Sequence, residues 1–190
     1  TNLVPVLKSY WLMIHVSIIT SSYGFFSLGA VLGLISLWLI ICTNSNNKSR
    51  LNSTLKELTI INEKALEIGL FMLTIGTFLG GVWANESWGR YWGWDPKETW
   101  ALVSVLLYTF VLHTRFIPSL RNSFTFNMLS MFSIWTIIMT YFGVNYYLSG
   151  LHSYAAGDPM PIPVFVYYLL ALMIITTIIA KLRFRKNYKL

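Results

Sequence analysis

Residues 88–100 read WGRYWGWDPKETW, between two hydrophobic segments long enough to cross a membrane. This stretch holds four tryptophans, a tyrosine, two glycines and four charged residues in thirteen positions. Flat aromatic side chains beside cations suit a large, flat, anionic ligand with an apolar body, and haem is the obvious candidate. The three histidines of the chain, His15, His113 and His152, are candidate ligands for the haem iron.

The composition is that of a polytopic membrane protein. Of the 190 residues, 55% are hydrophobic and 11% are charged, whereas a soluble domain carries about 25% charged residues. We therefore interpret the net charge of +7 as a signal of membrane topology, not of nucleic-acid binding. The single cysteine, Cys42, excludes an internal disulfide or a CxxC site. Because the chain opens on TNLVPVLKSYW without an initiator methionine, we expect it to belong to a longer polypeptide.

Five hydrophobic stretches predict an all-α bundle of about five transmembrane helices, forming one domain over residues 1–190. The predicted spans are residues 10–42, 65–84, 98–116, 124–148 and 164–182. A polar loop, TNSNNKSRLNSTLKE, should separate the first two spans, and residues 85–97 should form an external tryptophan-rich loop. Asp95, Pro96 and Glu98 fit a capping box that begins the third span. Capping accounts for these three residues but not for the tryptophans.

The distribution of lysine and arginine predicts the orientation of the bundle. One side carries three of these residues, Lys8, Arg90 and Lys97. The other side carries eleven: Lys48, Arg50, Lys56, Lys64, Arg115, Arg121, Lys181, Arg183, Arg185, Lys186 and Lys189. By the positive-inside rule, the tryptophan-rich loop faces outward and the C-terminal tail is cytoplasmic, or stromal in a plastid.

The three histidines are expected at two depths. At about 1.5 Å per helical residue, His15 lies roughly 10 Å outside the hydrocarbon core, and His152 follows the fourth span on the same side. His113 lies roughly 20 Å deeper than the outer start of its span. His15 and His152 can therefore share one haem, and an inner site at His113 lacks its second ligand in this chain. A simpler interpretation stays open, in which the first two are interfacial anchors and His113 makes an interhelical hydrogen bond.

These residues resemble a known family. The stretch WGRYWGWDPKETW is similar to the WWD signature of the haem-handling proteins of cytochrome c maturation. The strings SYWLMIHV, LLYTFVLHTR and YLSGLHSYA place histidines as the CcsA (ResC) family of System II does, and the resemblance covers essentially the whole chain. It implies a protein that binds haem b (iron protoporphyrin IX) and carries or presents it at the outer membrane face. It also implies support for covalent thioether attachment to the CxxCH motifs of apocytochrome c.

The resemblance also implies the site residues. His15 and His152 match the external axial ligands, and His113 matches one ligand of a transmembrane site whose other histidine has no counterpart here. The haem-binding residues of the WWD region are then Trp83, Trp88, Gly89, Arg90, Trp92, Trp94, Asp95 and Trp100. From their charge, Arg90 or Lys97 is a candidate partner for the haem propionates. We assign no catalytic residue, because Cys42 lies at the inner end of a span.

The implied partners are a CcsB (ResB) subunit or fused domain, apocytochrome c, the lipid bilayer and a thiol-reducing protein, with no nucleic acid. Together with CcsB, the chain would form part of a cytochrome c haem ligase (holocytochrome c synthase); whether it is itself an enzyme stays open. The implied location is the bacterial inner (plasma) membrane or the plastid thylakoid membrane, with the loop periplasmic or lumenal.

Other functions stay open on the sequence. One is a dihaem electron-transfer subunit, which needs paired histidines at both depths. Another is a transporter that cages an aromatic or cationic solute among the tryptophans. A third is a System I-type haem-handling protein, which carries a similar tryptophan-rich loop.

Overall fold

The computed structural model describes residues 9–152 and 161–188, and these residues form an all-α bundle. Five of the described helical segments are long and apolar enough to cross a membrane, which confirms the predicted fold class of an integral membrane protein. The elements are α2 (Tyr10–Cys42), α3 (Lys48–Trp88), α4 (Pro96–His113), the 3-10 turn η1 (Thr114–Phe116), α5 (Ser123–Ile138), the π-helical turn η2 (Met139–Gly143), α6 (Val144–Tyr147) and α7 (Val164–Tyr188).

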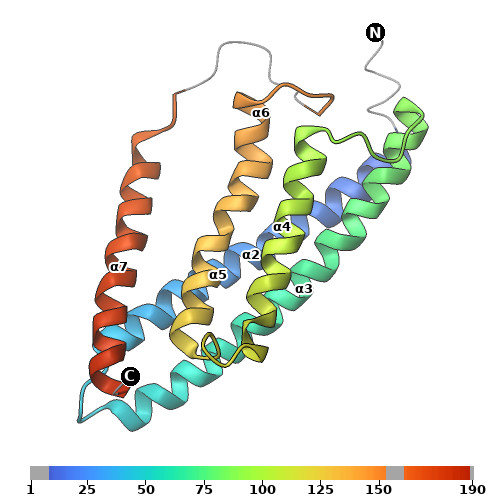
Figure 1. Cartoon of the computed structure of the whole chain (residues 1–190). Helices are drawn as coiled ribbons and strands as arrows, with labels where there is room; N and C mark the ends of the chain where they lie inside the picture. The colour runs from blue at the N-terminus through green and yellow to red at the C-terminus, as the bar shows by residue number, and fades with distance from the viewer. Residues whose placement is uncertain (1–8, 153–160, 189–190) are drawn as a thin grey trace.

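The two longest helices, α2 and α3, lie side by side and carry the rest of the bundle (Figure 1). α5 packs on α2, α4 packs on α3 and α5, and α7 rests on α2 and α5. The α3–α4 connection lies at one end of the bundle, which we call the tryptophan-loop end. The α2–α3 turn, the α4–α5 turn and the end of α7 lie at the opposite end, the tail end.

Two predicted loops are partly helical in the structure. The supposed polar loop is helical from Lys48 onward, so α3 begins well before the predicted span at residue 65. The supposed loop over residues 85–97 begins later, because α3 continues to Trp88. The irregular connection is therefore residues 89–95, called the tryptophan loop below. α3 has 41 residues and is about 60 Å long, twice the hydrocarbon thickness, so its polar ends remain helical outside the apolar layer.

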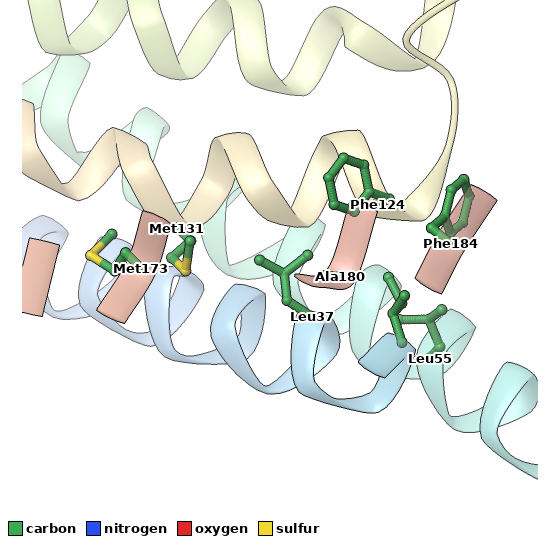
Figure 2. Close-up of a cluster of buried hydrophobic side chains, with 8 residues drawn as sticks. Leu37, Leu55, Phe124, Met131, Met173, Ala180 and Phe184 are labelled. Carbon is green, nitrogen blue, oxygen red and sulfur yellow. The ribbon is translucent and has the colours of Figure 1, made fainter. Parts of the chain in front are cut away.

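Apolar side chains hold the tail end together. Leu37 of α2, Leu55 of α3 and Phe124 of α5 meet Phe184 of α7 in a cluster that Figure 2 shows, with Met131, Met173 and Ala180. A second cluster around Phe26 and Tyr108 continues the core toward the tryptophan-loop end. Both clusters use α2, which is why this helix organises the bundle.

Close helix contacts depend on small residues, as expected for membrane bundles. A Cβ on Gly29 would lie 2.5 Å from Leu66, and one on Gly33 would lie 2.6 Å from the carbonyl oxygen of Asn127. Gly24, by contrast, has no described atom within 4 Å of its added Cβ, so it makes no such contact. Of these three glycines of α2, Gly29 and Gly33 therefore allow close helix packing and Gly24 does not.

A buried polar network joins α2, α3 and α5. Asn62 donates from Nδ2 to Oδ1 of Asn127 at 2.9 Å, and Asn127 donates to Oγ1 of Thr59 at 2.8 Å. The hydroxyl of Ser130 lies 3.0 Å from both Oδ1 of Asn62 and the carbonyl oxygen of Gly29. Asn62, Asn127 and Ser130 are fully buried. Buried polar groups that are mutually satisfied fix the register of packed helices.

Candidate haem-binding pocket

Caps at both ends hold the tryptophan loop in place. α3 ends where Gly89 is left-handed (φ 71°) and its amide donates to the carbonyl of Asn85 at 2.9 Å. α4 begins with the predicted capping box. The carboxylate of Asp95 accepts from the amide of Lys97 at 3.3 Å, and Glu98 accepts from the amide of Asp95 at 3.2 Å. The capping-box prediction is confirmed.

Asp95 also holds the segment that follows α6. Its Oδ1 accepts from the amide of Leu151 at 2.6 Å, and its Oδ2 accepts from Nδ1 of His152 at 2.8 Å. Gly150 permits this approach, since a Cβ there would lie 2.4 Å from Oδ1 of Asp95. The sequence interpretation placed Asp95 at the helix cap and in the haem-binding region but missed its link to His152. No local pattern reveals a contact between residues 57 positions apart.

The charge states of this pair follow from burial and hydrogen bonding. Burial raises the pKa of Asp95, but hydrogen bonds from His152, Leu151 and Lys97 outweigh that effect and hold its pKa below the ordinary value. Burial lowers the pKa of His152, and the bond to Asp95 offsets only part of this. At neutral pH an ionised carboxylate therefore faces a neutral imidazole. A carboxylate only accepts hydrogen bonds, so Nδ1 of His152 carries the proton and Nε2 is unprotonated.

His15 reaches the same region from α2. Its Nδ1 lies 2.7 Å from the carbonyl oxygen of Gly76 on α3. A carbonyl also only accepts, so the neutral ring again has its unprotonated nitrogen at Nε2. Gly80 makes room for the ring, because a Cβ there would lie 2.6 Å from Cε1 of His15. The missing side chain of Gly80 thus leaves the space that this imidazole occupies.

The two imidazoles line one pocket at the tryptophan-loop end. Both contact the same buried indole: Trp83 lies parallel to the His15 ring at 6.4 Å between centroids and 5.6 Å from the His152 ring. Trp88 meets His152 edge-on at 4.9 Å. The pocket has a volume of about 80 Å³, and its lining includes both histidines together with Ile19, Tyr23, Thr77, Gly80, Gly81, Tyr91, Trp92, Lys97, Glu98, Ala101 and Thr140.

The remaining predicted loop residues divide between the pocket and its rim. Trp92 lines the pocket. The ring of Trp94 stands edge-on to the ring of Trp92 at 5.7 Å between centroids, and Trp94 is 69% exposed. Trp94 has a left-handed backbone (φ 58°), which is strained for a bulky residue. In the described part of the chain, Trp100 and Arg90 do not line the pocket. Arg90 instead lies 6.0 Å over the ring of Trp88 and 3.9 Å from Glu98.

Of the two candidate cations for propionates, Lys97 is the one that faces the pocket. It lines the cavity and donates to Oδ1 of Asn145 at 2.9 Å. Within the described residues, no group of three or more His, Cys, Asp or Glu side chains gathers to hold a metal ion. Haem iron needs fewer protein ligands, because the porphyrin supplies four of its bonds. Two imidazoles are enough to complete its coordination.

His113 lies at the tail end, apart from this pocket. Its Nδ1 lies 2.7 Å from the carbonyl oxygen of Thr109, and its exposed ring contacts Phe116 at 5.7 Å between centroids. A cavity of about 210 Å³ lies beside this turn, where Arg115 pairs with Glu63. The structure thus separates His113 from the other two histidines, as the depth argument predicts.

The fold and pocket define a class: a polytopic membrane protein that gathers two histidines from different helical segments beside a tryptophan-rich loop. Residues 1–152 match the family described as cytochrome C assembly protein. The chain is 37% identical over 180 residues to cytochrome c biogenesis protein CcsA of Prochlorococcus marinus, covering 81% of this chain and 57% of that protein. It is 36% identical over 195 residues to CcsA of Cyanophora paradoxa, with 80% and 60% covered.

A further relative is Protein NrfI of Wolinella succinogenes, 56% identical over 161 residues, which covers 85% of this chain and 18% of that protein. The chain therefore belongs to the cytochrome c assembly protein family, as a member similar to CcsA. It spans less than two thirds of the length of these relatives.

Proposed function

We propose that this chain handles haem for cytochrome c assembly, and that His15 and His152 are the axial ligands of one haem iron. The observation that carries this proposal is the shared arrangement of the two rings. Each donates from Nδ1 to a group that only accepts, Gly76 or Asp95, and each lines the same pocket. Both neutral rings therefore offer Nε2, which is the nitrogen that binds a metal when Nδ1 is held in this way.

The walls of the pocket suit a porphyrin. Trp92 lines the pocket with flat apolar surface, and aromatic contacts of this kind contribute about 0.5–1.5 kcal/mol each beyond area burial. Trp83 does not line the pocket but packs against both histidine rings and supports them. Lys97 supplies the cation for a propionate through a charge-assisted hydrogen bond. We assign the haem as haem b, because its vinyl groups are needed for the attachment that follows.

Loading requires the pocket to open. A cavity of about 80 Å³ holds a few water molecules and not a porphyrin. Tyr91 and Trp92 close it from the tryptophan loop, and neither belongs to a helix. We propose that this loop swings outward to admit haem while the helix-borne His15 keeps its place.

In the next step each apocytochrome thiol adds across one vinyl group, so the sulfur and the hydrogen are both retained and nothing leaves. The sole cysteine of the chain, Cys42, lies at the tail end and cannot take part. The reacting atoms come from haem and client, and this chain contributes proximity and orientation. The proposed partners are a CcsB (ResB) protein, apocytochrome c and a thiol-reducing protein. His113 would hold haem at the tail end before transfer to the pocket, with a second ligand from outside this sequence.

Spectra of purified variants test the ligand assignment. We expect the full-length protein to copurify with haem that shows a low-spin, bis-histidine spectrum when reduced. His15→Ala or His152→Ala should abolish that signal from the pocket and block cytochrome c assembly, and added imidazole should restore part of both. Lys56→Ala, at an exposed site on α3, is the control. A bis-histidine spectrum with normal assembly in either histidine variant would refute the proposal, whereas a protein without a Soret band would favour a transporter.

A further inference from the structure

Asp95 makes more contacts than a helix cap requires. Its carboxylate accepts from the amides of Lys97 and Leu151 and from the ring of His152, although it is only 6% exposed. The first contact begins α4, and the other two fix the segment after α6. One carboxylate therefore joins the start of one helix to an imidazole contributed from 57 residues further along the chain.

We infer that Asp95 is the positioning residue that holds His152 in the Nδ1–H form and presents its Nε2 to the haem iron. This inference rests on the proposed function and gives the carboxylate a role that neither capping nor haem contact supplies. An imidazole bonded to a carboxylate keeps its ring orientation and tautomer, and it becomes a stronger metal ligand. His15, bonded to the neutral carbonyl of Gly76, lacks that charge assistance.

Replacing the carboxylate by the amide of asparagine separates the two roles. Asparagine is as good an N-cap as aspartate, so α4 should still begin correctly in Asp95→Asn when the amide oxygen faces the amide of Lys97. The amide NH₂ must then occupy one of the two oxygen positions. If it faces Leu151, two donors oppose each other and the segment carrying His152 is released. If it faces His152, it also faces the amide of Lys97. It then donates to Nδ1 and drives the ring proton to Nε2, which blocks the iron-binding nitrogen, and the cap bond to Lys97 is lost as well.

The first readout needs no haem. Nitrogen-15 NMR of histidine-labelled, haem-free protein reports which nitrogen of each of the three rings carries the proton, with His15→Ala and His113→Ala used for assignment. We expect the Nδ1–H form for His152 in the wild type and a mixed population in Asp95→Asn. The second readout is haem affinity, which should fall about 10–100-fold in Asp95→Asn, as for other groups that orient metal ligands. Added imidazole should recover part of the bis-histidine spectrum.

The matched control is Asn122→Asp, which makes the reverse exchange at the N-cap of α5, where Asn122 accepts from the amide of Thr125 at 2.8 Å. This variant should keep wild-type tautomers and haem affinity. If Asp95→Asn keeps both as well, while His152→Ala loses the bis-histidine spectrum, the positioning role is wrong and the ligand assignment stands. If His152→Ala keeps the spectrum, the proposed function itself fails.

Discussion

In all three histidines of this chain, Nδ1 is hydrogen-bonded within the protein. His15 and His113 each donate from Nδ1 to a helical carbonyl, and His152 donates to a carboxylate. Each partner only accepts hydrogen bonds, so in the neutral form of each ring the proton lies on Nδ1 and Nε2 is unprotonated. The same presentation therefore occurs at both ends of the bundle, and position in the fold decides which rings can share a ligand.

A substitution at Gly80 tests whether the position of the His15 ring depends on its contact with α3. A methyl group at this position would lie 2.6 Å from Cε1 and 2.8 Å from Nδ1 of the ring. Since the imidazole is rigid, Gly80→Ala should displace it and break its bond to Gly76. We expect haem affinity to fall about tenfold or more, measured by titration of the haem-free protein. Gly24→Ala, where no described atom lies within 4 Å, should bind haem like the wild type. Equal affinities in the two variants would show that His15 is not confined by α3.

The half-buried His152 also predicts a pH dependence of stability. Burial lowers its pKa in the folded protein, whereas the unfolded chain binds this proton near pH 6.5. The unfolded state then binds more protons, so stability should fall as the pH drops below about 6.5. We expect the Tm of the haem-free protein in detergent to decrease from pH 7.5 to pH 5.5, and to decrease less in His152→Gln. An identical pH dependence in both proteins would contradict this explanation.

At the scale of elements, the polar network of α2, α3 and α5 is the clearest determinant of helix register. Asn127→Ala would leave Nδ2 of Asn62 without its acceptor and would remove the donor to the hydroxyl of Thr59, which keeps its own bond to the carbonyl of Leu55. We expect a loss of about 0.5–2 kcal/mol in the free energy of unfolding, the usual range for hydrogen bonds between membrane helices. Ser17→Ala is the control, because Ser17 is exposed and bonds only to the carbonyl of Met13 in its own helix. Reversible unfolding in mixed detergent measures both variants, and equal stabilities would show that the network is dispensable.

Hydropathy predicted the helices well, because each is apolar enough to be recognised without its neighbours. Hydropathy missed the helix over residues 48–57, because this segment is polar. Lysine, glutamate and leucine favour a helix in water, and hydropathy does not measure that preference. The capping box at Asp95 was also predictable, because its residues are adjacent in sequence. The pairing of Asp95 with His152 and the seating of His15 on Gly80 were not. Both contacts depend on how segments distant in the sequence pack together, and the pattern of a single sequence does not predict that packing.

At the scale of the whole molecule, the candidate haem-binding pocket and most of the basic residues lie at opposite ends of the bundle. The tryptophan loop lies at one end, and the α2–α3 turn, the α4–α5 turn and the end of α7 lie at the other (Figure 1). The pocket is at the first end, because Trp92 of the tryptophan loop and His152 line it. Lys48 begins α3, Arg115 and Arg121 flank the α4–α5 turn, and the last turn of α7 is basic. This arrangement supports the predicted orientation, in which the basic end faces the cytoplasm or stroma and the pocket faces the compartment where cytochromes c are assembled.

Cysteine labelling tests that orientation directly. Cys42 is exposed at the tail end, so a membrane-impermeant maleimide should label it only after the membrane is permeabilised. A second protein with Cys42→Ser and Ser149→Cys carries its only thiol at the tryptophan-loop end, next to the segment that bears His152. That thiol should react in intact cells, since it faces outward. The reverse pattern would place the pocket on the cytoplasmic face. Haem bound by His15 and His152 would then be out of reach of an external apocytochrome, and the proposed delivery step would fail even if both histidines bind iron.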